Sequence, residues 1–324
     1  MPPRYPLATI LPSPYPSTWS DTGLLPIAEG EHAVRNSVIA SALLLATLAA
    51  ASAVAQEVGP PNGTLVIVGG AMRDPTIVER FLDLAGGTDA PIVVIPTAGG
   101  RDDYDQFWSG LRQFKAAGAT SLKVLHTNDP AIANTEEFVR PITEARGVWF
   151  SGGRQWRLAD AYLDTKVHEE LWALLARGGV IGGSSAGATI QGSYLARGDT
   201  RTNTIMMGDH EVGLGFLKNS AIDQHLLRRN RQFDLIEIIE AHPELIGIGI
   251  DENTAIVVQG DRFEVMGQGY VAIYDHNRRL DSGGLFYFLA PGDRFSLNTR
   301  EAFRMSSAQQ PIDRVVEEKW PGGP

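Results

Sequence analysis

The chain has 324 residues, of which 43% are hydrophobic and 20% are charged, a composition typical of a soluble globular protein. Its formal net charge of −10 argues against nucleic acid as a partner, because nucleic-acid-binding proteins present strongly basic faces. It contains no cysteine, so disulfides, thiolate nucleophiles and sulfur-ligated metals are excluded, and a covalent nucleophile must carry oxygen.

An apolar run at residues 38–55, VIASALLLATLAAASAVA, follows Arg35 and ends in a small-x-small triplet. This pattern predicts a secretory signal peptide cleaved after Ala55, and the polar residues that follow favour cleavage over a transmembrane anchor. We expect residues 1–55 to be a leader and signal peptide, unstructured or cleaved, and residues 56–324 to form a single α/β domain of a serine hydrolase. The mature protein is then secreted or periplasmic, without stable membrane insertion.

Short β-rich apolar runs alternate with helical patterns from residue 64 onward, which is the rhythm of a mostly parallel sheet with helices on both faces. We expect strands at residues 64–68, 91–96, 122–125, 147–150 and 179–181, and helices at 76–84, 107–117 and 167–176. Ligands bind beyond the carboxyl ends of the strands in such sheets. A helix at 233–239 and short strands at 247–250, 254–258, 262–266, 269–274 and 285–289 predict a C-terminal antiparallel β extension.

The pentapeptide GSSAG at residues 183–187 matches G-x-S-x-G between an apolar strand and a segment capable of forming a helix. This context predicts a nucleophile elbow, a sharp turn that exposes the hydroxyl of the central Ser185. The free N–H groups of the following helix favour negative charge beside that hydroxyl. An ordinary Gly/Ser loop is the alternative, whereas a phosphate-binding loop is disfavoured because no lysine follows the glycines.

A serine hydroxyl needs a base to activate it, and His225 stands out among seven histidines. It ends the segment AIDQH and precedes the basic run RRNR, although a lone histidine is more often structural. An acidic group should orient the imidazole. Asp199, fourteen residues after Ser185, ranks first for this role, ahead of the pair Asp251-Glu252 at the end of the strand GIGI.

Five blocks occur in the order GTLVIVGG, VWFSGGRQWRL, GGVIGGSSAGA, AIDQHLLRRNR and GIGIDENTAIVV, within a stretch of similarity that covers about residues 63–289. Together they resemble the cyanophycinase-like serine peptidases, whose relatives include the α-aspartyl dipeptidases. The resemblance implies a flavodoxin-like sheet, a catalytic set of Ser, His and an acid, and no metal or organic cofactor. It also implies a peptide or peptide-like small substrate, and it leaves a homodimer open.

Carried over by position, the resemblance assigns Ser185 as the nucleophile and His225 as the base. The backbone N–H groups of Ala186 and Gly153 would form the oxyanion hole. The residues that would line the substrate pocket are Gln155, Asp223 and Gln224. A substrate carboxylate would pair with Arg231, Arg228 or Arg154, because guanidinium groups hold carboxylates in a bidentate fork.

Two departures from the family pattern bear on specificity and on the catalytic acid. Ala159 and Asp234 stand where cyanophycinases place basic residues, while Arg231 keeps another basic position. The specificity for β-linked aspartyl-arginine therefore does not transfer on sequence alone. Cyanophycinases also place the third catalytic residue, a glutamate, in a Gly-rich loop after the serine, and here that loop is shorter and ends at Asp199.

The sequence thus predicts a serine peptidase that cleaves a peptide or isopeptide bond next to an aspartyl residue through an acyl-enzyme on Ser185. Two alternatives stay open. An α/β esterase usually carries its histidine near the chain end, whereas His225 is followed by a long β-rich region. A secreted peptide-binding protein that kept the fold without turnover is the alternative from outside the enzymes.

Overall fold

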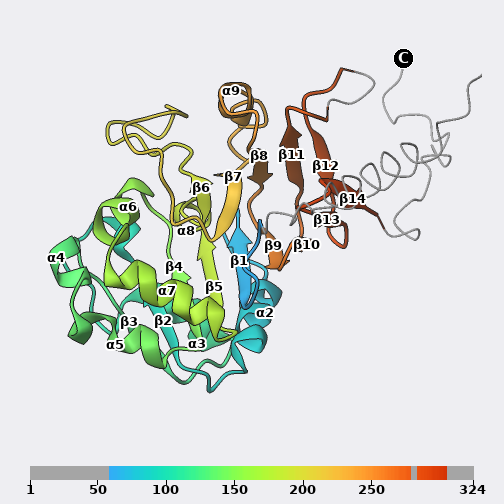
Figure 1. The fold of residues 1–324 in the computed structure, drawn as a ribbon. Coiled ribbons are helices and arrows are strands. Elements are labelled where there is room, and N and C mark those ends of the chain that lie inside the picture. Colours follow the sequence, from blue (N-terminus) through green and yellow to red (C-terminus); the bar gives the residue numbers. More distant parts are fainter. Residues whose placement is uncertain (1–57, 279–282, 305–324) are drawn as a thin grey trace, which may run out of the picture. The chain divides into compact units, whose positions relative to one another are not determined.

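The computed structural model describes residues 58–278 and 283–304, which all belong to the unit Ala55–Pro324 (Figure 1). The predicted leader and signal peptide, residues 1–55, lie outside these ranges, and their cleavage stays a prediction. None of the helices in the described ranges combines the length and the apolar character needed to cross a bilayer.

Nine strands of the described residues form the main sheet, in the order β14-β13-β10-β9-β1-β5-β4-β2-β3. The half from β1 to β3 is parallel, and β9 joins β1 antiparallel to begin the other half. The parallel strands are β1 (Thr64–Val68), β2 (Ile92–Ile95), β3 (Leu122–Val124), β4 (Gly147–Phe150) and β5 (Val180–Ser184). The antiparallel strands are β9 (Thr254–Gln259), β10 (Arg262–Gly267), β13 (Arg294–Ser296) and β14 (Glu301–Phe303).

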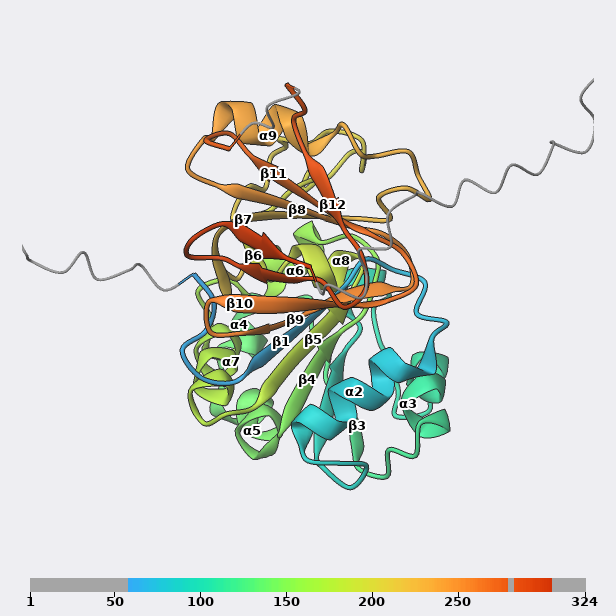
Figure 2. The ribbon, with the colours of Figure 1, turned by 90° about the vertical axis from the view of Figure 1, so that its right-hand side faces the viewer.

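Helices cover both faces of the parallel half, as the apolar runs of its strands require (Figure 2). On one face Phe81 and Phe114 pack against Trp149 of β4, and these residues come from α2 (Pro75–Ala85) and α3 (Arg112–Ala116). On the other face Ile142 and Leu171 belong to a second cluster. The helices there are α4 (Pro130–Ala133), α5 (Glu136–Glu144), α6 (Trp156–Tyr162) and α7 (Lys166–Ala176).

A second sheet of five described strands, ordered β12-β11-β8-β7-β6, packs against the first. Its strands are β6 (Gly192–Tyr194), β7 (Leu217–Gln224), β8 (Ile246–Ile250), β11 (Val271–Asp275) and β12 (Tyr287–Leu289). Strands β6, β7 and β8 are parallel, whereas β11 and β12 are antiparallel to their neighbours. The helix α9 (Leu235–Ala241) packs in a third apolar cluster on this sheet.

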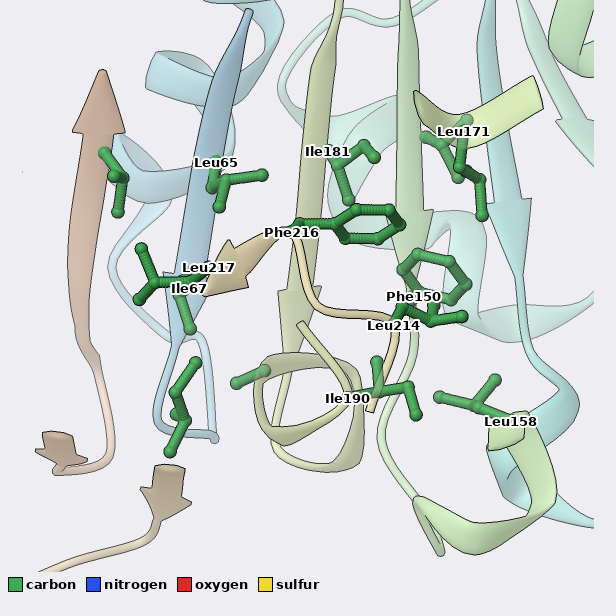
Figure 3. Packing of buried hydrophobic residues seen from close by; sticks show 14 of the residues in the cluster. Leu65, Ile67, Phe150, Leu158, Leu171, Ile181, Ile190, Leu214, Phe216 and Leu217 are labelled. Carbon is green, nitrogen blue, oxygen red and sulfur yellow. The ribbon is translucent and has the colours of Figure 1, made fainter. Parts of the chain in front are cut away.

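One apolar cluster joins the two sheets. Figure 3 shows Phe216, just before β7, and Leu217, its first residue, in the same cluster as Leu65 of β1 and Ile181 of β5. All four side chains are fully buried. The two sheets are therefore packed against each other through a shared core.

The prediction of an α/β fold with a mostly parallel, helix-covered sheet is confirmed, while the finer flavodoxin-like assignment stays a prediction. The predicted antiparallel extension is more complex than expected, because its strands divide between two sheets and β8 pairs parallel with β7. The expected helix at 107–117 is a 3-10 turn (Ser109–Leu111) followed by the short α3, with Gly110 inside the turn where it weakens helix formation.

Candidate active site

Ser185 occupies the tight turn between β5 and the short helix α8 (Ala186–Thr189). Its φ of 58° and ψ of −113° lie outside the usual regions for a non-glycine residue, a strain that costs about 1–3 kcal/mol. The turn depends on its glycines: a Cβ on Gly183 would lie 2.1 Å from the carbonyl oxygen of Gly187. The local structure is therefore the strained strand-to-helix turn that GSSAG predicts.

His225 follows the last residue of β7 and reaches the serine across the gap between the two sheets. Its Nε2 lies 2.8 Å from Oγ of Ser185. The backbone of His225 also has a positive φ, 56°, and its N–H donates to the carbonyl of Gly69 at 2.8 Å. Gly70 leaves room for the ring, since a Cβ there would lie 2.3 Å from Cε1 of His225.

Glu252 supplies the acidic group, with Oε1 at 2.8 Å from Nδ1 of His225. The first-ranked expectation, Asp199, is corrected by this contact, because Ser185 and Glu252 engage the two ring nitrogens. The Asp199 carboxylate instead accepts the backbone N–H groups of Arg201 and Thr202 at 2.9 and 3.0 Å, which closes its own loop. Glu252 belongs to the pair that the sequence ranked second.

The surroundings of His225 favour the neutral form of its imidazole. Burial lowers the pKa of His225, and the positive charges of Arg229 and Arg231 lower it further. The hydrogen bond to Glu252 acts in the opposite direction but does not outweigh burial. A neutral imidazole whose Nδ1–H is donated to a carboxylate presents a free acceptor at Nε2, the state that a general base requires.

The loop after β4 lies beside Ser185, because β4 and β5 are neighbours in the sheet. Gly152 faces the hydroxyl, since a Cβ on Gly152 would lie 3.7 Å from Oγ of Ser185. Gly153, which the resemblance assigned to the oxyanion hole, has φ 149°. The side on which a Cβ would lie faces the carbonyl of Ala98. Ala186 directly follows the serine at the start of α8, and its part in an oxyanion hole stays a prediction.

The four residues expected to bind substrate are buried, and each engages other parts of the protein. Gln155 donates from Nε2 to the carbonyls of Ala196 and Arg197 at 2.7 and 3.0 Å. Arg231 donates to Oε1 of Gln224 at 3.0 Å, and burial lowers the pKa of Arg231 to about 10. Asp223 is fully buried, and both of its oxygens accept from Arg197, at 2.8 and 2.9 Å.

Sequence reasoning missed Arg197. Besides Arg231, it named Arg228 and Arg154 as partners of a substrate carboxylate, and these two differ in exposure. Arg228 is exposed, while Arg154 is half-buried and donates to the carbonyl of Asp199 at 2.5 Å. Arg197 and Arg231 line a cavity of about 520 Å³. The other residues that line it are Thr204, Met206, Arg229, Phe233, Asp234 and Glu237.

A serine, an imidazole and a carboxylate in hydrogen-bonded series, at a strand-to-helix turn of an α/β sheet, define the site of a serine hydrolase. The profile of Peptidase family S51 matches residues 65–266 of the sequence. The chain belongs to this family of serine-type peptidases.

Its relatives include two proteins named cyanophycinase. That of Geminocystis herdmanii (strain PCC 6308) is 32% identical over 285 residues, which cover 79% of this chain and 98% of that protein. That of Synechococcus elongatus is 33% identical over 222 residues, covering 66% and 68%. Among solved structures, a peptidase from an acI-B1 actinobacterium has a TM-score of 0.58 at 26% identity, covering 74% of this chain and 98% of that one.

Proposed function

We propose that this S51 peptidase is secreted and hydrolyses a peptide or isopeptide bond next to an aspartyl residue, through an acyl-enzyme on Ser185. The observation that carries the proposal is the series Ser185–His225–Glu252, joined by two contacts of 2.8 Å. Membership of a peptidase family implies a peptide substrate.

In the proposed mechanism, His225 Nε2 takes the proton of Ser185 while Oγ attacks the carbonyl carbon of the scissile bond. Glu252 accepts Nδ1–H and stabilises the imidazolium that forms. The oxyanion faces N–H groups of Ala186 and of the Gly152-Gly153 loop. The imidazolium then protonates the leaving amine, and water, activated by the same imidazole, attacks the ester and frees the serine.

Two features support an aspartyl group beside the scissile bond. The relatives named above are cyanophycinases, and the sequence resembles that family in five blocks. The buried Arg231 lines the cavity, and its charge acts on His225. Burial lowers the pKa of Arg231 to about 10, so a substrate carboxylate would stabilise its charge.

A fluorophosphonate probe tests the serine chemistry. We expect wild type to be labelled and Ser185→Ala to be unlabelled, with Ser184→Ala as the matched control that keeps its labelling. Labelling of Ser185→Ala, or of no variant, would contradict the mechanism, and the second outcome would favour a binding protein. A panel of Asp-Xaa and β-Asp-Xaa dipeptides, cyanophycin and simple esters then separates an aspartyl peptidase from an esterase.

The secreted location rests on the apolar run that ends at Ala55. Expression of the full chain in a bacterial host, followed by N-terminal sequencing of the exported protein, tests it. We expect the mature protein to begin at Gln56. An intact N-terminus on cytoplasmic protein would contradict the proposal.

A further inference from the structure

Arg197 lies between two carboxylates in the manner of a bound cationic ligand. Its Nε and Nη2 donate to the two oxygens of Asp223 at 2.8 and 2.9 Å, and Nη2 also reaches Oδ2 of Asp234 at 2.5 Å. Its Nη1 donates to the carbonyl of Asn203 at 2.9 Å. The side chain of Arg197 is 2% exposed and that of Asp223 is 0% exposed, whereas that of Asp234 is 37% exposed, so only Asp234 of the two carboxylates faces solvent.

The backbone fixes this guanidinium in place. Arg197 has a positive φ of 57°, which a non-glycine residue keeps only where its surroundings hold it. Its N–H donates to the carbonyl of Met206 at 3.0 Å, and its own carbonyl accepts from Nε2 of Gln155. Arg197 is therefore a built part of the cavity wall and not a mobile surface side chain.

The ion pairs lie next to the proposed base. Asp223 is on β7 and His225 follows the end of that strand two residues later, so their Cα atoms are at most about 7 Å apart. Arg197 and Asp234 line the cavity of about 520 Å³ together with Arg231. A substrate side chain that enters this cavity meets Arg197 already paired with Asp223 and Asp234.

We propose that Arg197 determines substrate specificity. Its guanidinium occupies the cation site that Asp223 and Asp234 would otherwise offer to a substrate. Both oxygens of Asp223 accept from Arg197, and three arginines, Arg197, Arg229 and Arg231, line the cavity against two acids, Asp234 and Glu237. An arriving guanidinium would therefore meet more positive than negative charge. The cavity therefore excludes positively charged substrate side chains and accepts neutral or acidic ones. This inference rests on the proposed function, because it assigns the cavity to the peptide substrate.

Binding to the Ser185→Ala enzyme tests the inference without turnover. The probes are β-Asp-Arg and β-Asp-citrulline, which have side chains of nearly the same shape but differ in charge. By calorimetry we expect Ser185→Ala to bind the citrulline peptide at least about tenfold more tightly than the arginine peptide. Equal binding, tighter binding of the arginine peptide, or binding of neither peptide would overturn the inference.

Variants of Arg197 in the Ser185→Ala background provide the second arm. Arg197→Met vacates the carboxylates, so we expect the preference to reverse in favour of the arginine peptide, while Arg197→Lys keeps a cation and the original preference. An unchanged preference in Arg197→Met refutes the role of Arg197. The measurement on Ser185→Ala leaves the cavity intact and decides the matter even if Arg197→Met does not fold. Fluorophosphonate labelling of wild type separately reports whether the proposed serine chemistry fails.

Discussion

Replacing Glu252 by glutamine tests the geometry of the site most sharply. In wild type the carboxylate accepts Nδ1–H at 2.8 Å, which leaves Nε2 free to take the serine proton. A glutamine amide can instead donate to Nδ1, which places the imidazole proton on Nε2 and removes the acceptor that Ser185 needs. Removing the acid of a triad in this way costs about 10⁴-fold in kcat, or about 5 kcal/mol of transition-state stabilisation.

The loss expected here is about 10³- to 10⁴-fold in kcat, because the Glu252 side chain is 22% exposed and water can partly replace it. Asp199→Asn is the matched control: its remaining oxygen can still accept the N–H groups of Arg201 and Thr202, so kcat should stay within about threefold of wild type.

Both variants are assayed for kcat on the best dipeptide substrate, with urea unfolding to confirm that each is folded. If Asp199→Asn loses about 10³-fold while Glu252→Gln stays within about tenfold of wild type, the geometry of the site has been misassigned.

Three further changes test the surroundings of the site. Gly70→Ala should lower kcat/KM by about 100-fold, because the new Cβ displaces His225, whereas Gly86→Ala, also at positive φ but in open space, should leave it unchanged. The acid limb of the profile of kcat/KM against pH should have its midpoint below 6.5, since burial lowers the pKa of His225 and activity is lost as pH falls through that pKa. Arg229→Ala removes a charge that lowers this pKa, so the limb should move to higher pH, and a shift to lower pH would refute the assignment. Phe81→Ala should lower the free energy of unfolding by about 3–5 kcal/mol in urea titrations, because its ring packs on Phe114 and Trp149 in the core.

The serine and the histidine could be proposed from sequence because local patterns carry them. GSSAG sets a strand-to-helix turn, and AIDQH matches a family block, so neither needs long-range geometry. The strand β7 was not recognised, since LKNSAIDQ mixes polar and apolar residues without clear alternation. Without β7 the pairing of Gln224 with Ile250 was unknown, and that pairing places Glu252 beside His225.

Asp199 and Arg197 show a second limit of what can be predicted from the sequence. Asp199 was favoured because it is near Ser185 in sequence, but its carboxylate is used to close a loop. Arg197 is a charged residue whose burial depends on two distant carboxylates and a left-handed backbone. Charged residues are almost never fully buried unless paired, and a pairing of this kind is invisible in composition or periodicity.

The residues of the proposed triad come from two sheets, and this has a consequence for how the enzyme loses activity. Ser185 follows β5 in the nine-stranded sheet, while His225 and Glu252 follow β7 and β8 in the five-stranded one. A small slip between the sheets parts nucleophile from base while each sheet keeps its hydrogen bonds. On heating, activity should therefore be lost before secondary structure, so a turnover assay reports whether the two sheets are still packed together.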